Sequence, residues 1–503
     1  MTSYGWLGGR AQDPALVFGD RSLTFAALDD RAERVAAGLV AAGCAPGDRV
    51  LALLPPGIEL FELLLGCVRA GLVLVPMNWR LTEDELLTVA RDARATALVS
   101  GEAYAGPAAA LLERTSGRAH LRIGPSDWYE RWLADQHPPA EARRPEPAPG
   151  DVVLQIYTSG TSGAPKGVLL TAANLAAKVP RAALAWDLGA GSVSLLATPL
   201  FHVGGLGWGL AGLHAGARTI VATSAAPTDL LVTLRTERIT HTFLVPTMIE
   251  RMCALAGTTR LPDLHTIIYG AAPIDPRTRR AATDVFGCRL LHVYGLTETT
   301  GAITQLDAGE VDPLDPRTGS VGRPYPWVAI SVRDPRTGAE LPPGRPGEIW
   351  TRSAQNTPGY HRDDAATAEL YGPGGWLRTG DGGYLDADGY LFVTHRIKDL
   401  IISGGENVNP GEVEEVLRQH ADVADVAVVG LPDRSWGEVV TAVVVPRPGR
   451  ALTEADVLAY AHGRLAGYKR PRRARIVASL PRTATGKVLK HRLVAQIAAT
   501  EAT

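Results

Sequence analysis

The stretch Tyr157-Thr-Ser-Gly-Thr-Ser-Gly-Ala-Pro-Lys-Gly167 directly follows an apolar run, Val152–Ile156, that is typical of a buried strand. Its glycines allow a tight turn whose backbone N–H groups converge on an anion, and Lys166 adds a mobile positive charge. A strand followed by such a loop is a recurrent phosphate site, so we expect it to bind a nucleotide. The loop is not a Walker A motif, because Pro165 stands where that motif has its second glycine.

Strand-like and helix-like segments alternate on both sides of this loop. Such alternation predicts an α/β fold with doubly wound sheets, whose ligands bind beyond the carboxyl ends of the strands. Thr24 is placed to cap a helix, and Thr82-Glu-Asp-Glu85 has the pattern of a capping box. The expected strands are Asp48–Leu54, Leu72–Pro76, Val152–Ile156, Leu195–Thr198, Thr219–Ala222, Thr242–Val245, Thr266–Tyr269 and Leu290–Val293.

The chain changes character after Gly319, where short strands and turns predict a small β-rich unit. The last hundred residues have the pattern of a compact α+β module. We therefore predict a large N-terminal domain over residues 1–397 and a small C-terminal domain over residues 398–503. Gly207-Trp-Gly-Leu-Ala-Gly212 fits a dinucleotide-binding pattern, but no strand leads into it, and its glycine spacing instead predicts a closely packed helix.

Composition excludes several classes of partner. The 503 residues carry 51 basic and 53 acidic side chains, so no general attraction to nucleic acid is expected. The longest apolar stretch, Val50–Pro76, contains prolines and charges, so integral membrane association is not expected. The four cysteines lie far apart and the start lacks a signal-peptide pattern, which together predict a cytoplasmic protein without structural zinc. Oligomeric state is not indicated.

Lysine is rare, because arginine supplies most of the basic charge. A compact ammonium and a planar guanidinium have different uses, so each lysine is a candidate for a specific role. The six lysines are Lys166, Lys178, Lys398, Lys469, Lys487 and Lys490.

Five motifs in order resemble those of the adenylate-forming superfamily, which includes acyl-CoA synthetases, peptide-synthetase adenylation domains and luciferases. The resemblance covers essentially the whole chain and is strongest to aryl- and acyl-CoA ligases, through Met77–Thr82, Ser403–Pro410 and Trp436-Gly-Glu. The five motifs are Tyr157–Gly167, Tyr294-Gly-Leu-Thr-Glu298, Arg378-Thr-Gly-Asp381, Arg396-Ile-Lys-Asp399 and Pro481-Arg-Thr-Ala-Thr-Gly-Lys487.

The resemblance implies two half-reactions and three cofactors: ATP, Mg²⁺ and coenzyme A. A carboxylate first attacks the α-phosphate of ATP to give an acyl-adenylate, and a thiol then displaces AMP. Attack of one anion on another needs cations and N–H donors that offset the repulsion, which the motifs supply. The expected partners are therefore a small-molecule carboxylic acid and coenzyme A, or the phosphopantetheine of a carrier protein.

The resemblance also assigns the nucleotide site. The phosphates would be held by Thr158, Ser159, Gly160, Thr161, Ser162, Gly163 and Lys166, and the magnesium ion by Glu298 and Thr158. The ribose would be bound by Asp381 with Arg396, although a turn-capping role would also explain Asp381. The adenine walls would be Gly270, Ala271, Ala272, Tyr294, Gly295 and Thr297. The residue before Arg396 is His395, where many relatives have glycine.

Lys487 would be the catalytic lysine that bridges the attacking carboxylate and the α-phosphate, unless it is an ordinary surface lysine. Lys398 would be the hinge about which the small domain rotates between half-reactions. Coenzyme A would contact Gly404, Gly405, Trp436 and Lys469.

The acyl pocket is expected near His202, Val203, Phe243, Tyr269, Gly270 and Gly301. His202 resembles a gate that moves between half-reactions, although a packed core histidine is the alternative. None of the six is a Lys or Arg, so a dicarboxylate would bury an unpaired charge, and an aromatic or medium-chain monocarboxylic acid is preferred.

Three other functions stay open at this point. The chain could load a carrier protein instead of coenzyme A, or adenylate an unusual oxyacid such as nitrite. A non-catalytic nucleotide-binding protein is the third, and the presence of Lys487, Glu298 and Asp381 argues against it.

Overall fold

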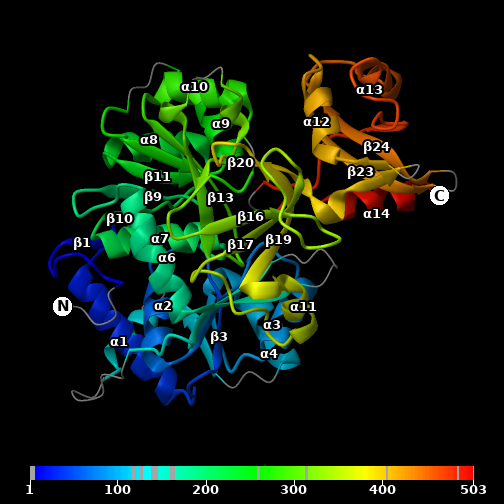
Figure 1. Ribbon diagram of the computed structural model, residues 1–503. Helices are drawn as coiled ribbons and strands as arrows, with labels where there is room; N and C mark the ends of the chain where they lie inside the picture. The colour runs from blue at the N-terminus through cyan, green and yellow to red at the C-terminus, as the bar shows by residue number, and fades with distance from the viewer. Residues whose placement is uncertain are drawn as a thin grey trace. The chain divides into compact units, whose positions relative to one another are not determined.

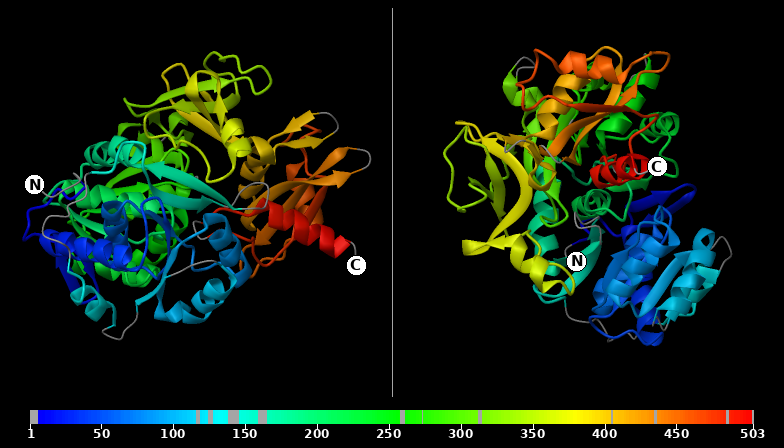
Figure 2. Two further views of the ribbon diagram at one scale, coloured as in Figure 1. Left: turned by 90° about the horizontal axis from the view of Figure 1, so that it is seen from below. Right: turned by 90° about the vertical axis from the view of Figure 1, so that its right-hand side faces the viewer.

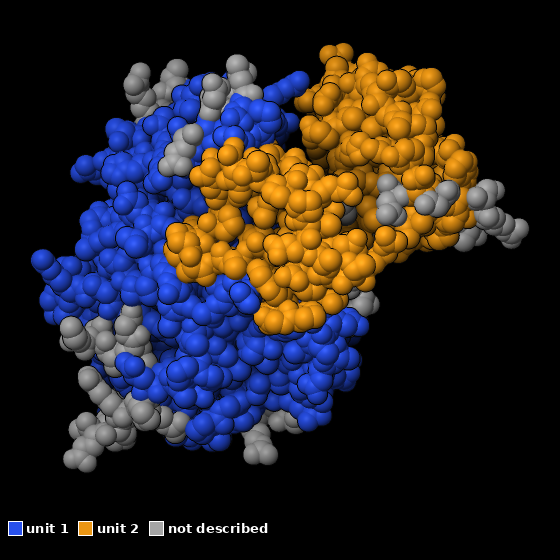
Figure 3. All heavy atoms as spheres, in the orientation of Figure 1, with its two compact units in different colours: residues 1–318, 352–371 blue, residues 319–351, 372–503 orange. Residues whose placement is uncertain are grey.

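The computed structural model describes residues 6–115, 119–123, 128–137, 146–158, 165–257, 261–272, 274–311, 315–403, 406–433, 436–483 and 486–501. The chain divides into two compact units (Figure 3). Unit 1 consists of residues 1–318 and 352–371, and unit 2 of residues 319–351 and 372–503. The units therefore group residues 319–351 and 372–397 with the C-terminal segment, and the functional boundary at 397/398 stays a prediction.

The first sheet of unit 1 ends in β7 and β8, the two strands that flank the glycine-rich stretch in the sequence. Its strands are parallel except for the last pair, in which β7 and β8 run antiparallel. Most of this sheet lies in the blue and cyan part of the ribbon, which also contains the helices α1 (Phe25–Ala41), α2 (Glu59–Ala70), α3 (Glu83–Ala93), α4 (Ala105–Arg114) and α5 (Trp128–Ala134) (Figure 1; Figure 2). The strand order is β6 (Ala119–Ile123), β5 (Ala97–Gly101), β3 (Arg49–Leu53), β4 (Val73–Pro76), β7 (Val152–Thr158) and β8 (Lys166–Thr171).

The second sheet of unit 1 is parallel in its centre, with antiparallel pairs β13–β14 and β1–β2. Its order runs β14 (Gly301–Asp307), β13 (Arg289–Leu296), β12 (Thr266–Tyr269), β11 (His241–Leu244), β9 (Val193–Leu196), β10 (Arg218–Val221), β1 (Pro14–Phe18) and β2 (Arg21–Thr24). The associated helices are α6 (Ala172–Ala185), α7 (Val203–Ala215), α8 (Pro227–Thr236), α9 (Pro246–Ala256) and α10 (Pro276–Phe286). Helix α11 (Asp364–Leu370) follows Tyr360, whose N–H donates to Thr367 Oγ1 of this helix at 3.0 Å.

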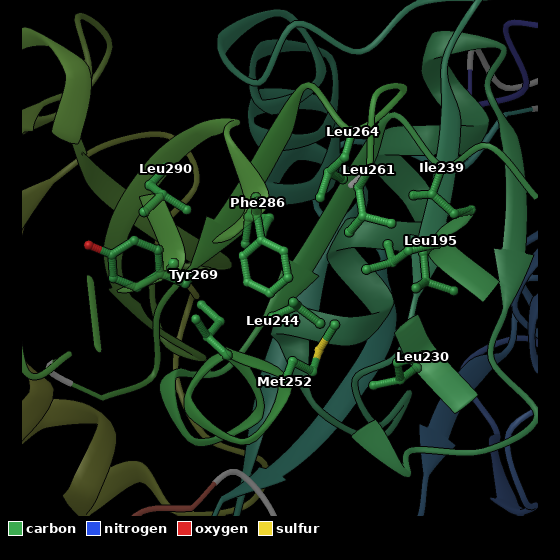
Figure 4. Packing of buried hydrophobic residues seen from close by; sticks show 14 of the residues in the cluster. Leu195, Leu230, Ile239, Leu244, Met252, Leu261, Leu264, Tyr269, Phe286 and Leu290 are labelled. Carbon is green, nitrogen blue, oxygen red and sulfur yellow. The ribbon is translucent and has the colours of Figure 1, made fainter. Parts of the chain in front are cut away.

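One face of this second sheet packs on α8, α9 and α10. The cluster joins strand residues such as Leu244 and Tyr269 to Met252 of α9 and Phe286 of α10 (Figure 4). The opposite face carries α7, whose glycines permit close packing. A Cβ atom on Gly209 would lie 2.4 Å from the Phe61 ring of α2. The prediction of a closely packed helix, not a dinucleotide loop, is therefore confirmed.

Unit 2 contains two smaller sheets. One holds β16 (Ala329–Arg333), β17 (Gly347–Arg352), β19 (Trp376–Leu385) and β20 (Leu391–Arg396). The other holds β22 (Glu406–Val408), β21 (Ile401–Ser403), β24 (Gly437–Pro446), β23 (Val423–Asp433) and β25 (Arg473–Ile476), with helices α12 (Pro410–Arg418), α13 (Glu454–Ala461) and α14 (Lys490–Glu501). A β-rich part followed by an α+β module is thus confirmed.

The local signals at helix starts are confirmed as well. The Thr24 hydroxyl accepts from the Ala27 N–H, and Thr82 and Glu85 form a complete capping box at α3. Among the described helices, none combines the length and apolar character that crossing a bilayer requires.

We predict that buried His241 makes the protein sensitive to acid. The side chain is 4% exposed, and burial, reinforced by the neighbouring His265, lowers its pKa to about 4. Above pH ~6.5 the imidazole is neutral in both states; as pH falls toward 4, only the unfolded chain takes up the proton, so the free energy of unfolding falls. A shift from 6.5 to about 4 corresponds to about 3 kcal/mol.

Urea unfolding of wild type and His241→Gln between pH 7.5 and pH 4 measures this effect. The variant should lose less stability than wild type over that interval, whereas His491→Gln, which changes an exposed side chain on α14, should follow wild type. Parallel curves for wild type and His241→Gln would contradict the assignment.

Candidate functional site

The turn 297–300 between β13 and β14 positions Glu298. Hydroxyl groups hold it together: Thr299 Oγ1 donates to the Gly301 carbonyl at 2.6 Å and accepts from the Leu296 N–H at 2.9 Å. The backbone is also crowded, since a Cβ atom on Gly295 would lie 2.0 Å from the Gly301 carbonyl oxygen. A run of threonines between two glycines therefore produces a narrow, rigid turn.

Tyr360 joins Glu298 to the lysine of the phosphate motif. Its hydroxyl donates to Glu298 Oε1 at 2.9 Å, and Lys166 Nζ lies 5.0 Å from the centre of its ring. Lys166 Nζ also lies 3.8 Å from Asp363 Oδ2. The segment carrying Tyr360 is fixed along β8, where the His361 N–H donates to the Gly167 carbonyl at 2.7 Å. Sequence reasoning missed Tyr360, which follows the turn signal Pro358-Gly359.

The structure brings together three predicted residues at this place. Thr158 ends β7 and lies opposite Lys166 in the antiparallel register, and Lys166 meets Glu298 through Tyr360. The phosphate-binding predictions for Ser159, Gly160, Thr161, Ser162 and Gly163 fall outside the described residues.

A polar cluster supports the strand that leads into the loop. The Tyr157 hydroxyl accepts from Gln155 Nε2 at 2.9 Å and donates to the Asp92 carboxylate. Burial and the adjacent Asp92 raise the pKa of Tyr157, so it remains a neutral donor. These hydrogen bonds hold the Tyr157 side chain, and with it the end of β7, in place.

The predicted adenine walls occupy two adjacent strand ends. Gly270 follows β12, and a Cβ atom there would lie 2.6 Å from the Val293 carbonyl oxygen of β13, so only glycine fits without a shift. Ala271 has φ +70°, a conformation that costs free energy in a residue with a side chain. Strain of this kind concentrates at ligand sites, which agrees with the predicted contact to a flat ring.

The structure separates Tyr269 from the other acyl-pocket candidates. In the β11–β12 register, Phe243 pairs with Ile268 and Leu244 pairs with Tyr269. Leu244 and Tyr269 enter the core on the α8–α10 face, and the Tyr269 ring stacks on His292. Phe243 instead lies 6.4 Å from the Trp208 ring of α7, on the other face. Alternation along a short strand explains the difference.

His202 immediately precedes α7 and has a neutral imidazole. Its Nε2 is buried without a hydrogen-bond partner among the described residues, and its ring lies 4.6 Å from that of Phe201. Burial, together with the positive charge of Arg80, lowers its pKa to about 4. An unpartnered buried nitrogen marks a place where a substrate group would find a hydrogen bond.

The structure also places a lysine beside the predicted acyl pocket. A Cβ atom on Gly301 would lie 4.0 Å from Val203 Cγ2 and 3.9 Å from Lys178 Cε. Sequence reasoning found no Lys or Arg among the six pocket residues and missed this neighbour, which comes from α6. Only the rarity of lysine in the chain pointed to it.

Unit 2 brings the predicted ribose residues together. Asp381 of β19 pairs with Arg396 of β20 in the sheet register, and Arg396 Nε lies 2.8 Å from Asp381 Oδ1. Arg396 Nη1 also donates to the Thr379 carbonyl at 3.1 Å. Asp381 is 3% exposed, so its carboxylate is held in one place. Lys398 lies in the short 3-10 turn Ile397–Asp399 that follows.

Lys487 lies in a closed turn with an exposed side chain. The Thr483 N–H donates to the Lys487 carbonyl at 2.7 Å, and the Lys487 N–H donates to Thr483 Oγ1 at 3.1 Å. This backbone arrangement holds the start of the side chain.

Two of the residues predicted to bind coenzyme A, Trp436 and Lys469, are described, and each contacts a charged side chain. The Arg472 guanidinium lies 3.7 Å from the centre of the Trp436 ring, and Lys469 Nζ lies 2.7 Å from Glu412 Oε1. The predictions for Gly404 and Gly405 fall outside the described residues.

Comparisons with known proteins agree with the predicted resemblance. The AMP-binding enzyme family model matches residues 6–361, and the AMP-binding enzyme C-terminal domain model matches residues 412–487. A fatty acid–[acyl-carrier-protein] ligase, ScoC, from Streptomyces coeruleorubidus is 36% identical over 95% of this chain and 92% of its own length. A feruloyl-CoA synthase from Amycolatopsis sp is 37% identical over 95% of this chain and 94% of its own length.

The fold comparison gives the same result. The crystal structure of ATP-bound MatB from Rhodopseudomonas palustris has a TM-score of 0.90 and 31% sequence identity, covering 99% of both chains. The chain is an AMP-forming acid–thiol ligase, which activates an acid as an acyl-adenylate and then forms a thioester. It belongs to the AMP-binding enzyme family.

Proposed function

We propose that the chain activates a small-molecule carboxylic acid with ATP and Mg²⁺ and then transfers the acyl group to coenzyme A. The observation that carries the proposal is the cluster in which Tyr360 joins Lys166 to Glu298 at the end of the phosphate motif. An aromatic or medium-chain acid is the preferred substrate, because Phe243 and Val203 offer apolar surface. A cytoplasmic location is part of this proposal.

The residues of unit 1 would bind the polyphosphate. Lys166 neutralises the pyrophosphate that leaves when the acid's oxygen bonds to the α-phosphorus. Glu298 and Thr158 offer the carboxylate and hydroxyl oxygens that suit magnesium, and the Tyr360 hydroxyl fixes the carboxylate. One carboxylate suffices, because Mg²⁺ usually keeps several waters and the substrate's phosphates as ligands. When bound, the ion would offset phosphate charge.

The residues of unit 2 would orient the nucleotide and complete both steps. Asp381, fixed by Arg396, accepts hydrogen bonds from the ribose hydroxyls. Lys487 brings the attacking carboxylate to the α-phosphate by attracting both anions. In the second step the thiol loses its proton, its sulfur bonds to the acyl carbon, and the bond to AMP breaks. Rotation of residues 398–503 about Lys398 would convert the enzyme from the adenylation conformation to the thioester-forming conformation.

Coenzyme A is the preferred acceptor for two reasons. The Trp436 ring, with the Arg472 guanidinium against it, offers a surface for the pantetheine arm, and the basic run Lys469–Arg473 offers positive charge for the phosphates of coenzyme A. A carrier-protein thiol is the second candidate, and the 36% identity to ScoC favours it. The two acceptors share the same chemical step and differ only in what surrounds the thiol.

Lys487→Ala should separate the half-reactions. Removal of the ammonium should lower acid-dependent pyrophosphate release by about a hundredfold or more, because a charge that stabilises the transition state is lost. Conversion of supplied acyl-adenylate and coenzyme A to thioester should stay within a few-fold of wild type. Lys490→Ala, three residues away and paired with Glu414, is the matched control. Equal loss of both half-reactions would count against the role of Lys487.

Tyr360→Phe should weaken adenylation by about tenfold, because Glu298 loses one hydrogen bond while the aromatic ring beside Lys166 remains. The loss should decrease at high Mg²⁺ concentration if Tyr360 acts by holding a metal ligand. Pyrophosphate release is measured as a function of Mg²⁺, with Tyr384→Phe as a control that removes a hydroxyl elsewhere. A loss of the same size at every Mg²⁺ concentration would exclude this role.

Trp436→Ala should raise the KM for coenzyme A about tenfold without changing acid-dependent pyrophosphate release, because only the second step uses the aromatic surface. Thioester formation is measured with coenzyme A and with a phosphopantetheinylated carrier protein in parallel. A wild-type preference for the carrier protein, with coenzyme A inactive, would replace coenzyme A by the second candidate.

A further inference from the structure

Lys178 is a buried lysine in α6 that no part of the proposed reaction uses. Its side chain is 5% exposed and crosses to the start of β14. There Lys178 Cε lies 3.9 Å from the position that a Cβ atom on Gly301 would occupy, and Val203 Cγ2 lies 4.0 Å from the same position. Gly301 and Val203 are predicted acyl-pocket residues, so this lysine borders the pocket.

The Lys178 nitrogen contacts a backbone oxygen and lies near an aromatic ring. Its Nζ donates to the Ala302 carbonyl at 2.6 Å and lies 5.4 Å from the centre of the Trp186 ring. Burial lowers the pKa of Lys178 to about 7, so the amine and ammonium forms are close in free energy at neutral pH. An anion that reached this nitrogen would therefore favour the charged form and form a charge-assisted hydrogen bond.

The turn beside Lys178 has other hydrogen bonds that hold it. Gln355 Nε2 donates to the same Ala302 carbonyl at 3.0 Å and to the Thr299 carbonyl at 2.7 Å. One helical turn before Lys178, Asn174 Nδ2 donates to the carbonyls of Ala354 and Asn356. Uncharged amides thus supply the structural hydrogen bonds, and a methionine would fill the volume without the cost of burying a charge. The property that lysine adds is positive charge.

We propose that Lys178 closes the distal end of the acyl pocket and binds a second anionic oxygen of the substrate, so that the enzyme selects dicarboxylic acids over monocarboxylic acids of the same shape. This inference rests on the proposed function and names its substrate class. Among the six predicted pocket residues no side chain could pair with a second carboxylate, which disfavoured dicarboxylic acids. Lys178 comes from α6, outside those six residues, and supplies the missing positive charge. The carboxylate remote from Lys178 is the one that becomes the acyl-adenylate.

The test uses two pairs of acids matched in shape: terephthalate with 4-methylbenzoate, and adipate with hexanoate. Calorimetry measures the Kd of each acid for the wild-type protein, and pyrophosphate release measures its activation. We expect the dicarboxylate of at least one pair to bind about tenfold or more tightly than its partner. Lys178→Met and Lys178→Gln should remove this preference while leaving the affinity for the monocarboxylate nearly unchanged.

Lys490→Met removes a lysine from α14 and should preserve the wild-type preference, which excludes an effect of net charge. Circular dichroism and thermal melting confirm that each variant is folded, and Lys178→Gln keeps a hydrogen-bond donor in case Lys178→Met does not fold. Equal affinities within both pairs for wild type, or an equal effect of Lys178→Gln on both members, would overturn the inference. Binding with the expected preference but without pyrophosphate release would instead refute the proposed function.

Discussion

The hydrogen bonds between the segment 354–360 and the turn 297–300 are the constraint on which the site depends. Thr300 Oγ1 donates to the Gln355 carbonyl, Gln355 Nε2 donates back to the Thr299 carbonyl, and the Thr357 N–H donates to the Glu298 carbonyl at 2.8 Å. The turn has a positive φ at Thr300 and close backbone contact at Gly295, so it is strained on its own. The partner segment holds it in that conformation.

This one constraint connects the two ends of the proposed chemistry. On one side, Tyr360 belongs to the same segment, and its hydroxyl binds Glu298 while its ring lies beside Lys166. On the other side, the Ala302 carbonyl next to the turn receives the hydrogen bond of Lys178. Phosphate binding and acid selection would thus share a single rigid turn. Gly301, beside the predicted acyl pocket, is separated from Glu298 by only two residues, Thr299 and Thr300.

The sequence was sufficient for the fold class, because strand and helix periodicity is local and the capping residues at Thr24 and Thr82 act within one turn. It also paired Asp381 with Arg396, since both belong to motifs that the resemblance supplies. It failed where sheet alternation decides orientation, as for Tyr269, and where a side chain crosses from another element. Lys178 and Tyr360 act on residues more than 60 positions away, and no local pattern encodes such contacts.

The central claim is that the acid's oxygen attacks the α-phosphate of ATP. The most direct measurement supplies an acid labelled with oxygen-18 in its carboxylate, together with ATP and coenzyme A, and determines by mass spectrometry which product carries the label. The account predicts that AMP gains one labelled oxygen and that pyrophosphate gains none. Label in inorganic phosphate or pyrophosphate, or thioester formation without labelled AMP, would contradict it.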